Sequence, residues 1–342
     1  MNANRAAIFT KFSYLPRTDF LAGFCATDYI ALIDLAMSKP TKHEVYYVPE
    51  QSKLPLFASI GLFLTVFGAG SILNGADKGV LVFTVGLIFF CYVLYTWFAT
   101  SIRENREGLN SAQLKRSYVW GMGWFIFSEV MFFAAFFGAL FYVRAFALPW
   151  LSEGWTNELL WDGFNGDWPL SVTPDEAVNG EAAKVTGPDE TMSIKTVDGF
   201  FGFLTWLPFV NTAILLSSSF TVHFAHTALK NDNKSKFNMW LGITVILGII
   251  FLGFQAYEYI HAYDIGLKLD SGIYGTTFFM LTGFHGFHVA MGTFMLGVQW
   301  FRSYFKGHFS HHDAFGFEAS SWYWHVVDVV WVGLFLFVYI FG

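Results

Sequence analysis

Seven long apolar stretches alternate with polar segments along this chain, and each is long enough to cross a bilayer, which takes about 20 residues. They span residues 54–73, 79–102, 118–148, 199–229, 237–263, 272–304 and 314–341. Several exceed that length, so we expect them to tilt or to extend beyond the hydrocarbon. Pro55 falls in the first turn of the first helix, where its missing N–H costs nothing, whereas Pro208 lies inside the fourth and is expected to kink it. The pattern predicts an all-α integral membrane protein.

Lysine and arginine concentrate in four of the segments that flank these stretches. They lie before the first stretch and after the second, fourth and sixth: Lys39, Lys42, Lys53, Arg103, Arg106, Lys115, Arg116, Lys230, Lys234, Lys236, Arg302 and Lys306. All four segments fall on one side of the membrane, and basic loops tend to stay on the cytoplasmic side. After seven crossings, we therefore expect a cytoplasmic N-terminus and a C-terminus on the opposite side.

The composition agrees with a membrane protein. Apolar residues make up 54% of the chain, aromatic residues 20% and charged residues 13%, against about 25% charged in soluble domains. Cys25 and Cys91 are the two cysteines and lie in different contexts. We interpret both as small apolar residues and expect no disulfide.

Two polar segments stand apart from the apolar pattern. Residues 150–198 are strongly acidic, and we interpret them as a solvated external insertion, with a docking surface for a basic partner as the alternative. Residues 1–36 lack a clear signal-peptide core. We expect them to be a poorly packed extension, with Met37 as a candidate start, followed by a cytoplasmic N-terminal segment over residues 37–53.

Glu129 is the most unusual residue of the third stretch, because it is a carboxyl flanked by aromatic side chains. At about 1.5 Å per residue it lies deep in the hydrocarbon, and His288 and His325 fall at comparable depth. A buried charge needs a partner. We hypothesise a hydrogen bond from Glu129 to His288 first and His325 second. The alternative is a protonated carboxyl bonded to Ser128 or to a backbone carbonyl.

The last two stretches carry five ionisable residues: His285, His288, Glu318, His325 and Asp328. His285 and His288 lie three residues apart and share a helix face, so with His325 they would suit a haem or a metal. However, no carboxylate and histidine set has metal-ligand spacing, because Glu318 and His325 are seven residues apart. Nearby small residues indicate close helix contact: Gly283, Gly286 and Gly292. We interpret the histidines as structural and predict no metal.

Three polar clusters lie near the ends of the stretches. The first is interpreted as a helix cap at the membrane surface: His223 and His226. The second is either a binding site for anionic lipid headgroups or a solvated loop: His308, His311 and His312. The third is interpreted as an exposed helix end: Glu258, His261 and Asp264.

Several of these blocks together match a known family. They are residues 126–130 (IFSEV), 255–259 (QAYEY), 278–289 (FFMLTGFHGFHV), 315–319 (FGFEA) and 322–331 (WYWHVVDVVW). In these motifs the chain resembles subunit III of haem–copper cytochrome c oxidases, in a bacterial form, from about residue 46 to the end.

The resemblance implies a seven-transmembrane-helix bundle split into helices 1–2 and 3–7 by a lipid-filled cleft. It implies a subunit without haem or copper, which packs on subunit I of a complex with subunit II, binds phospholipid, and supports proton uptake and stability of the catalytic subunit. It also implies a bacterial cytoplasmic membrane. Glu129 matches the family's buried carboxyl. Four residues match positions that contact lipid headgroups: Trp97, Arg103, Arg302 and His308.

Two other functions remain as alternatives. The equivalent subunit of a quinol oxidase or nitric oxide reductase generally lacks the first two helices, and both are present here. An independent proton channel or transporter would be built on Glu129 and the histidines, but the chain shows no discontinuous-helix or inverted-repeat signal.

Overall fold

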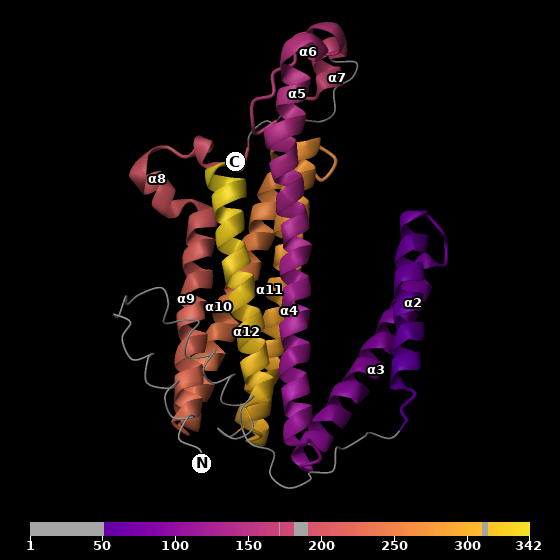
Figure 1. Cartoon of the computed structure of the whole chain (residues 1–342), viewed down its shortest axis with the longest axis vertical. Coiled ribbons are helices and arrows are strands. Elements are labelled where there is room, and N and C mark those ends of the chain that lie inside the picture. Colours follow the sequence, from indigo (N-terminus) through magenta and orange to yellow (C-terminus); the bar gives the residue numbers. More distant parts are fainter. Residues whose placement is uncertain (1–50, 171, 181–190, 310–313) are drawn as a thin grey trace, which may run out of the picture. The chain divides into compact units, whose positions relative to one another are not determined.

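The computed structural model describes residues 51–170, 172–180, 191–309 and 314–342, and every regular element among them is helical (Figure 1). The expected N-terminal extension, the candidate start at Met37 and most of the segment 37–53 lie outside the described residues, as do Cys25, His311 and His312. The chain divides into two compact units, residues 1–121 and 122–342.

Six helical segments in the described residues are long and apolar enough to cross a membrane: α2 (Leu54–Leu73), α3 (Gly79–Arg106), α4 with its continuation (Ala112–Ser152), α9 (Leu207–Lys230), α10 (Lys234–Asp264), and α12 with its continuation (Phe315–Ile340). The protein is therefore a multi-pass membrane protein. The seventh predicted span corresponds to α11 (Ile273–Lys306), which has 34 residues. Its threonines, glycines and two buried histidines make it less apolar, so its crossing stays a prediction.

Helices α2 and α3 form a hairpin in the first unit, held by glycines at the contact. A Cβ atom at Gly68 would lie 2.3 Å from the backbone nitrogen of Phe83, and one at Gly86 would lie 2.6 Å from that of Thr65. Side chains larger than hydrogen would push the backbones apart. This is the small-residue packing that membrane helices use to approach closely.

Helix α4 (Ala112–Tyr142) continues without a break through a π-helical segment (Val143–Ala147) into α5 (Leu148–Ser152). The acidic segment beyond it contains α6 (Gly154–Leu160) and α7 (Pro174–Asn179). It has a small core of Leu148, Phe164 and Leu170. The Asn157 amide lies 3.0–3.1 Å from three backbone carbonyl oxygens of this segment. The insertion is thus partly packed as well as solvated.

The predicted fourth span, residues 199–229, is two helices. Short α8 (Gly199–Thr205) ends at Trp206, whose backbone is extended, and α9 begins at Leu207 with Pro208 in its first turn. The expectation of a proline kink inside this helix is wrong. A proline in the first turn breaks no helical hydrogen bond, so Pro208 begins α9 instead of bending it.

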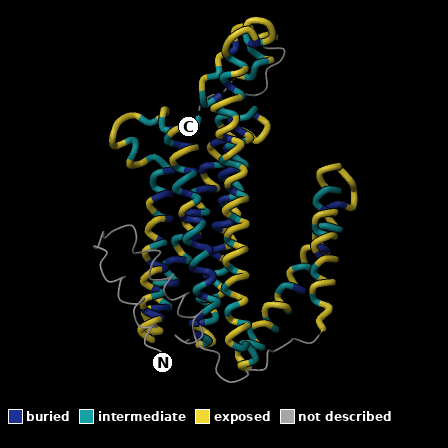
Figure 2. The backbone as a smooth tube through the Cα atoms, in the orientation of Figure 1, coloured by how far each residue is buried: buried dark blue, intermediate teal, exposed yellow. Residues whose placement is uncertain are grey.

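Helices α9, α10, α11 and α12 pack in a closed ring, each against its neighbours, and their buried residues line its interior (Figure 2). Trp324 lies at the centre of this ring. Cβ atoms at Gly248 and Gly292 would lie 2.9 and 2.8 Å from its indole ring, and its Nε1 donates to Ser218 Oγ at 2.9 Å. One side chain of α12 thereby joins α9, α10 and α11.

Helix α4 packs on this ring through large side chains instead of close backbone approach. Stacked, tilted or edge-on ring pairs recur along it: Phe125–Tyr323, Phe132–Phe284, Phe136–Phe284 and Phe137–Phe337. Aromatic contacts of this kind each stabilise by about 0.5–1.5 kcal/mol. The polar group midway along this aromatic contact is Glu129.

Candidate functional site

Glu129 and His288 form a direct hydrogen bond between α4 and α11. Glu129 Oε2 lies 2.8 Å from His288 Nε2. The side chain of His288 is 8% exposed and that of Glu129 is 23% exposed. The structure thus brings the carboxyl to the first of its two expected partners. The Ser128 hydroxyl donates to the carbonyl of Phe125 at 2.7 Å, and the hydrogen bond of the Glu129 carboxyl runs to His288 instead of to this serine.

The second ring nitrogen of His288 defines the proton arrangement of the pair. Nδ1 lies 2.6 Å from the carbonyl oxygen of Phe284. A carbonyl oxygen can only accept, so Nδ1 carries a hydrogen. One proton is then shared in the bond between Nε2 and Oε2. The pair is either a carboxylic acid with a neutral imidazole or a carboxylate with an imidazolium, and its net charge is zero in both forms. A neutral pair avoids the cost of a net charge in hydrocarbon.

Aromatic rings surround this shared proton. The ring centroid of His288 lies 5.0 Å from that of Phe133, 5.9 Å from that of Phe132 and 6.3 Å from that of Tyr323. Phe133 is buried, and Tyr323 is nearly parallel to the imidazole. These rings limit water access from the ring side, so the carboxyl edge of Glu129 is the more exposed side of the pair.

His285 lies one turn away and serves a different contact. It is fully buried, and its Nε2 donates to the carbonyl of Val327 in α12 at 3.1 Å. Its ring lies 4.8 Å from that of Trp331, which in turn donates from Nε1 to Thr212. His285 therefore links α11 to α12. Two of the three nearby glycines are in close contact with another helix: a Cβ atom at Gly292 would lie 2.8 Å from the ring of Trp324, and one at Gly283 would lie 3.3 Å from the hydroxyl of Tyr259.

His325, the second expected partner of Glu129, lies beside Ser219 and Asp328. Its Nδ1 is 3.2 Å from Ser219 Oγ and 3.8 Å from Asp328 Oδ2. The Ser219 hydroxyl also donates to the buried carboxyl of Asp328. This cluster joins α9 to α12.

Glu318 lies in the first turn of α12, and its Oε1 is 3.5 Å from His226 Nε2 at the end of α9. An acidic side chain there also faces the positive end of the helix dipole. The sequence placed these two residues in separate clusters. Helix order alone does not show that the end of α9 meets the start of α12.

The burial of Glu258 contradicts a second expectation. The sequence suggests an exposed helix end, and His261 and Asp264 are indeed exposed, but Glu258 is 0% exposed. The Gln255 amide donates to Glu258 Oε2 at 3.1 Å. The hydroxyl of Tyr339 lies beside the carboxyl without hydrogen-bond geometry. The available signal was the spacing of Gln255, Glu258 and the buried Ala262, which share one face of α10.

The four positions matched to lipid headgroups are distributed over both units. Trp97 and Arg103 are exposed on α3. The guanidinium of Arg302 lies 4.8 Å from the ring centroid of Phe309 and donates to Gln299 at 2.9 Å. The backbone N–H of His308 donates to the carbonyl of Arg302 at 3.3 Å. Within the described ranges, no three His, Cys, Asp or Glu residues are grouped to hold a metal ion.

Comparison with known proteins agrees with the motifs. The family described as cytochrome c oxidase subunit III matches residues 43–158 and 191–342. A probable cytochrome c oxidase subunit 3 of Rickettsia felis is 36% identical over 305 residues, which cover 88% of this chain and 97% of the relative. The subunit 3 of Prototheca wickerhamii is 36% identical over 302 residues, covering 88% and 98%. That of Drosophila melanogaster is 36% identical over 307 residues, covering 90% and 100%.

The matched ranges contain both members of the Glu129 and His288 pair and all seven long helices, and they are interrupted within the acidic insertion. A family match over most of the chain, together with relatives aligned over nearly their whole length, leaves one assignment: the chain belongs to the family of cytochrome c oxidase subunit III.

Proposed function

We propose that this chain is the non-redox accessory subunit of a terminal cytochrome c oxidase, that it packs on subunit I in the complex with subunit II, binds phospholipid, and supports proton uptake and stability of the catalytic subunit. Membership of the family implies an oxidase complex as its setting. The observation that supports a role beside a proton pathway is the hydrogen bond of 2.8 Å between Glu129 and His288, in which the carboxyl side chain is 23% exposed.

The proposal includes seven crossings in a bacterial cytoplasmic membrane, with the N-terminus in the cytoplasm and the C-terminus in the periplasm. It also includes a lipid-filled cleft between helices 1–2 and helices 3–7. The distribution of lysine and arginine supports the orientation, and the length of α11 supports the seventh crossing. Trp97, Arg103, Arg302 and His308 would contact lipid headgroups, because cationic and indole side chains suit the membrane interface.

Purification through an affinity tag on this chain tests the assignment. In mild detergent we expect haem-bearing subunit I and subunit II to copurify, with the optical spectrum of a haem–copper oxidase. A tagged chain that is folded but carries no haem-bearing partner would refute it.

Depletion of this chain from the purified complex tests the role. We expect the remaining subunits to keep their haem spectrum, to take up protons more slowly, and to lose activity after fewer turnovers. Adding the chain back with phospholipid restores both properties. Unchanged proton uptake and unchanged turnover life in the depleted complex would contradict the proposed role while leaving family membership intact.

Labelling of single cysteines tests the orientation. In a variant with both native cysteines replaced by serine, a cysteine at Lys234 should react with an impermeant maleimide in inside-out vesicles alone. A cysteine at Glu158 should react in right-side-out vesicles alone, and the reverse pattern would show that the orientation is wrong.

A further inference from the structure

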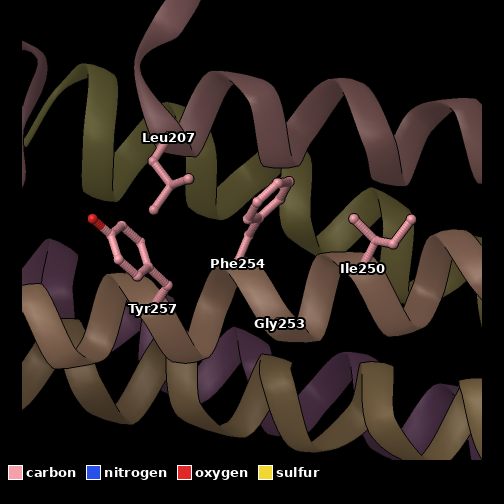
Figure 3. Close-up of a pocket in the computed structure, with 5 residues that line it drawn as sticks. All are labelled: Leu207, Ile250, Gly253, Phe254 and Tyr257. Atoms are coloured by element: carbon pink, nitrogen blue, oxygen red, sulfur yellow. The ribbon is translucent and has the colours of Figure 1, made fainter.

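A groove runs along the outer surface of α9 and α10 (Figure 3). Its lining consists of Leu207 from the start of α9 and four residues of α10: Ile250, Gly253, Phe254 and Tyr257. Its volume is about 410 Å³, within the range of ordinary ligand sites. The phenolic oxygen of Tyr257 is the polar side-chain atom of the lining, and it lies at the same end as Leu207. The feature is therefore an apolar surface groove with one polar end.

Gly253 creates the hollow. A Cβ atom added there would meet no other heavy atom within 4 Å, so its neighbours do not fill the space. Ile250 and Tyr257 lie three residues before and four residues after it, on the same helix face, and are 40% and 63% exposed. Their side chains form the two ends of the groove. Gly253 thus differs from Gly248 of the same helix, which is in close contact with Trp324.

The surroundings indicate where this groove meets the membrane surface. Both α9 and α10 are apolar enough to cross a bilayer. Short α8 leads into α9 at the end where Tyr257 lies, and Phe200 and Phe201 on it are 71% and 82% exposed. Tyr and Trp side chains gather where hydrocarbon meets water, and Tyr257 and Tyr263 at this end of α10 are 63% and 52% exposed. The polar end of the groove therefore lies at the membrane interface, and the groove runs from there toward Ile250 in the hydrocarbon.

We propose that this groove binds one acyl chain of a membrane phospholipid, whose ester or headgroup oxygen accepts a hydrogen bond from the Tyr257 hydroxyl. The site differs from the four headgroup positions named above. Trp97 and Arg103 belong to the other compact unit. Arg302 and His308 lie at the opposite end of the bundle, near the C-terminal end of α11.

A lipid chain suits this groove better than a helix of another protein. Helices that pack closely in membranes present small residues four positions apart. On α10 the positions four residues from Gly253 are Ile249 and Tyr257, which are 57% and 63% exposed. These large side chains hold a rigid helix away from the glycine, whereas a flexible chain of methylene groups can pass between them.

Photochemical labelling tests the proposal on the intact purified complex. The complex is reconstituted with a phosphatidylcholine that carries a diazirine on one acyl chain, irradiated, digested, and mapped by mass spectrometry. We expect adducts on Ile250 or Phe254. Gly253→Phe fills the groove and should lower these adducts about tenfold, equivalent to about 1.4 kcal/mol of binding free energy. The matched control, Val329→Phe, adds a ring at a position of α12 that is 71% exposed and does not line the groove, and it should keep them.

Assembly of each variant is checked by subunit content and haem spectrum, and Gly253→Leu serves as a second groove-filling variant. Absence of adducts on Ile250 and Phe254 in the unmodified complex would overturn the proposal, as would equal labelling with the groove filled. A photoreactive residue at Ile250 that couples to another polypeptide instead of lipid would also overturn it, since it would show a protein occupant. None of these results depends on how the chain affects proton uptake.

Discussion

The bond between Glu129 and His288 predicts a measurable energetic coupling between α4 and the ring of helices α9–α12. Helix α4 contacts that ring through large side chains rather than close backbone approach, so a polar bond within this aromatic contact carries a sizeable share of the attachment. The test is a double-mutant cycle with Glu129→Ala, His288→Ala and the combined variant. The cycle isolates the pair from the packing that each side chain makes with other residues.

The structure gives the expected magnitudes. Glu129→Ala leaves Nε2 of His288 without its partner on a side chain that is 8% exposed, and an unsatisfied buried group costs about 1–3 kcal/mol. His288→Ala also removes the ring contact with Phe133, for which a further 0.5–1.5 kcal/mol or so is expected. Glu129 is 23% exposed and regains some solvation. Interhelical hydrogen bonds in membranes couple by about 0.6 kcal/mol on average and about 1.7 at most. We expect the coupling near the upper end of that range.

The free energy of unfolding is measured by titrating the purified complex with sodium dodecyl sulfate in mixed micelles. The helical circular dichroism signal is followed for the unmodified protein and for each variant. A parallel cycle of Glu129 with His325 is the control, because His325 lies beside Ser219 and Asp328. That control should be additive within about 0.5 kcal/mol. A coupling no larger than the control for Glu129 and His288 would refute the reasoning.

Three further changes are expected to act through packing. Trp324→Phe removes the indole hydrogen bond to a serine of α9 and should lower the free energy of unfolding by about 1–2 kcal/mol. Trp324→Ala should lower it by about 3–5 kcal/mol, measured in the same titration. Equal losses for the two variants would contradict the central packing role. Gly68→Leu should push α2 and α3 apart and lower the stability of their hairpin by about 3 kcal/mol. Gly70→Leu should be tolerated, because a Cβ atom there meets no atom within 4 Å. Equal loss of assembled complex for the two variants would contradict the close-approach argument. Asn157→Ala removes the amide that lies against three carbonyl oxygens of the acidic segment, so this segment should be cleaved faster by added protease. An unchanged cleavage rate would show that the amide does not hold the segment in place.

Much of the architecture could be predicted from local pattern. The first predicted helix, residues 54–73, coincides with α2, and the others agree within about four residues, except that α4 begins six residues earlier than predicted, at Ala112, and except around Pro208. Length and apolar content are local properties, so the sequence determines them directly. The break at Trp206 was missed because α8 and α9 together form one continuous apolar stretch. An extended residue between two helices leaves no mark on hydropathy.

Depth in the membrane was also available from the sequence, because a helix rises about 1.5 Å per residue. Counting residues placed Glu129 at the height of both His288 and His325. Rotation about the helix axis was not available, because it depends on which side chains pack between neighbouring helices. The structure turns His288 toward Glu129 and places His325 beside Ser219.

The same distinction explains Glu258 and the pair of His226 with Glu318. Glu258 lies near a helix end, which suggests exposure, yet its face of α10 points into the bundle. His226 and Glu318 are about ninety residues apart and meet because α9 packs against α12. The sequence by itself determined that this chain enters the membrane as a series of long helices and which polar groups each carries at what height. The tertiary structure decided which of those groups face one another, because the azimuth of a helix is set by contacts that no single helix contains.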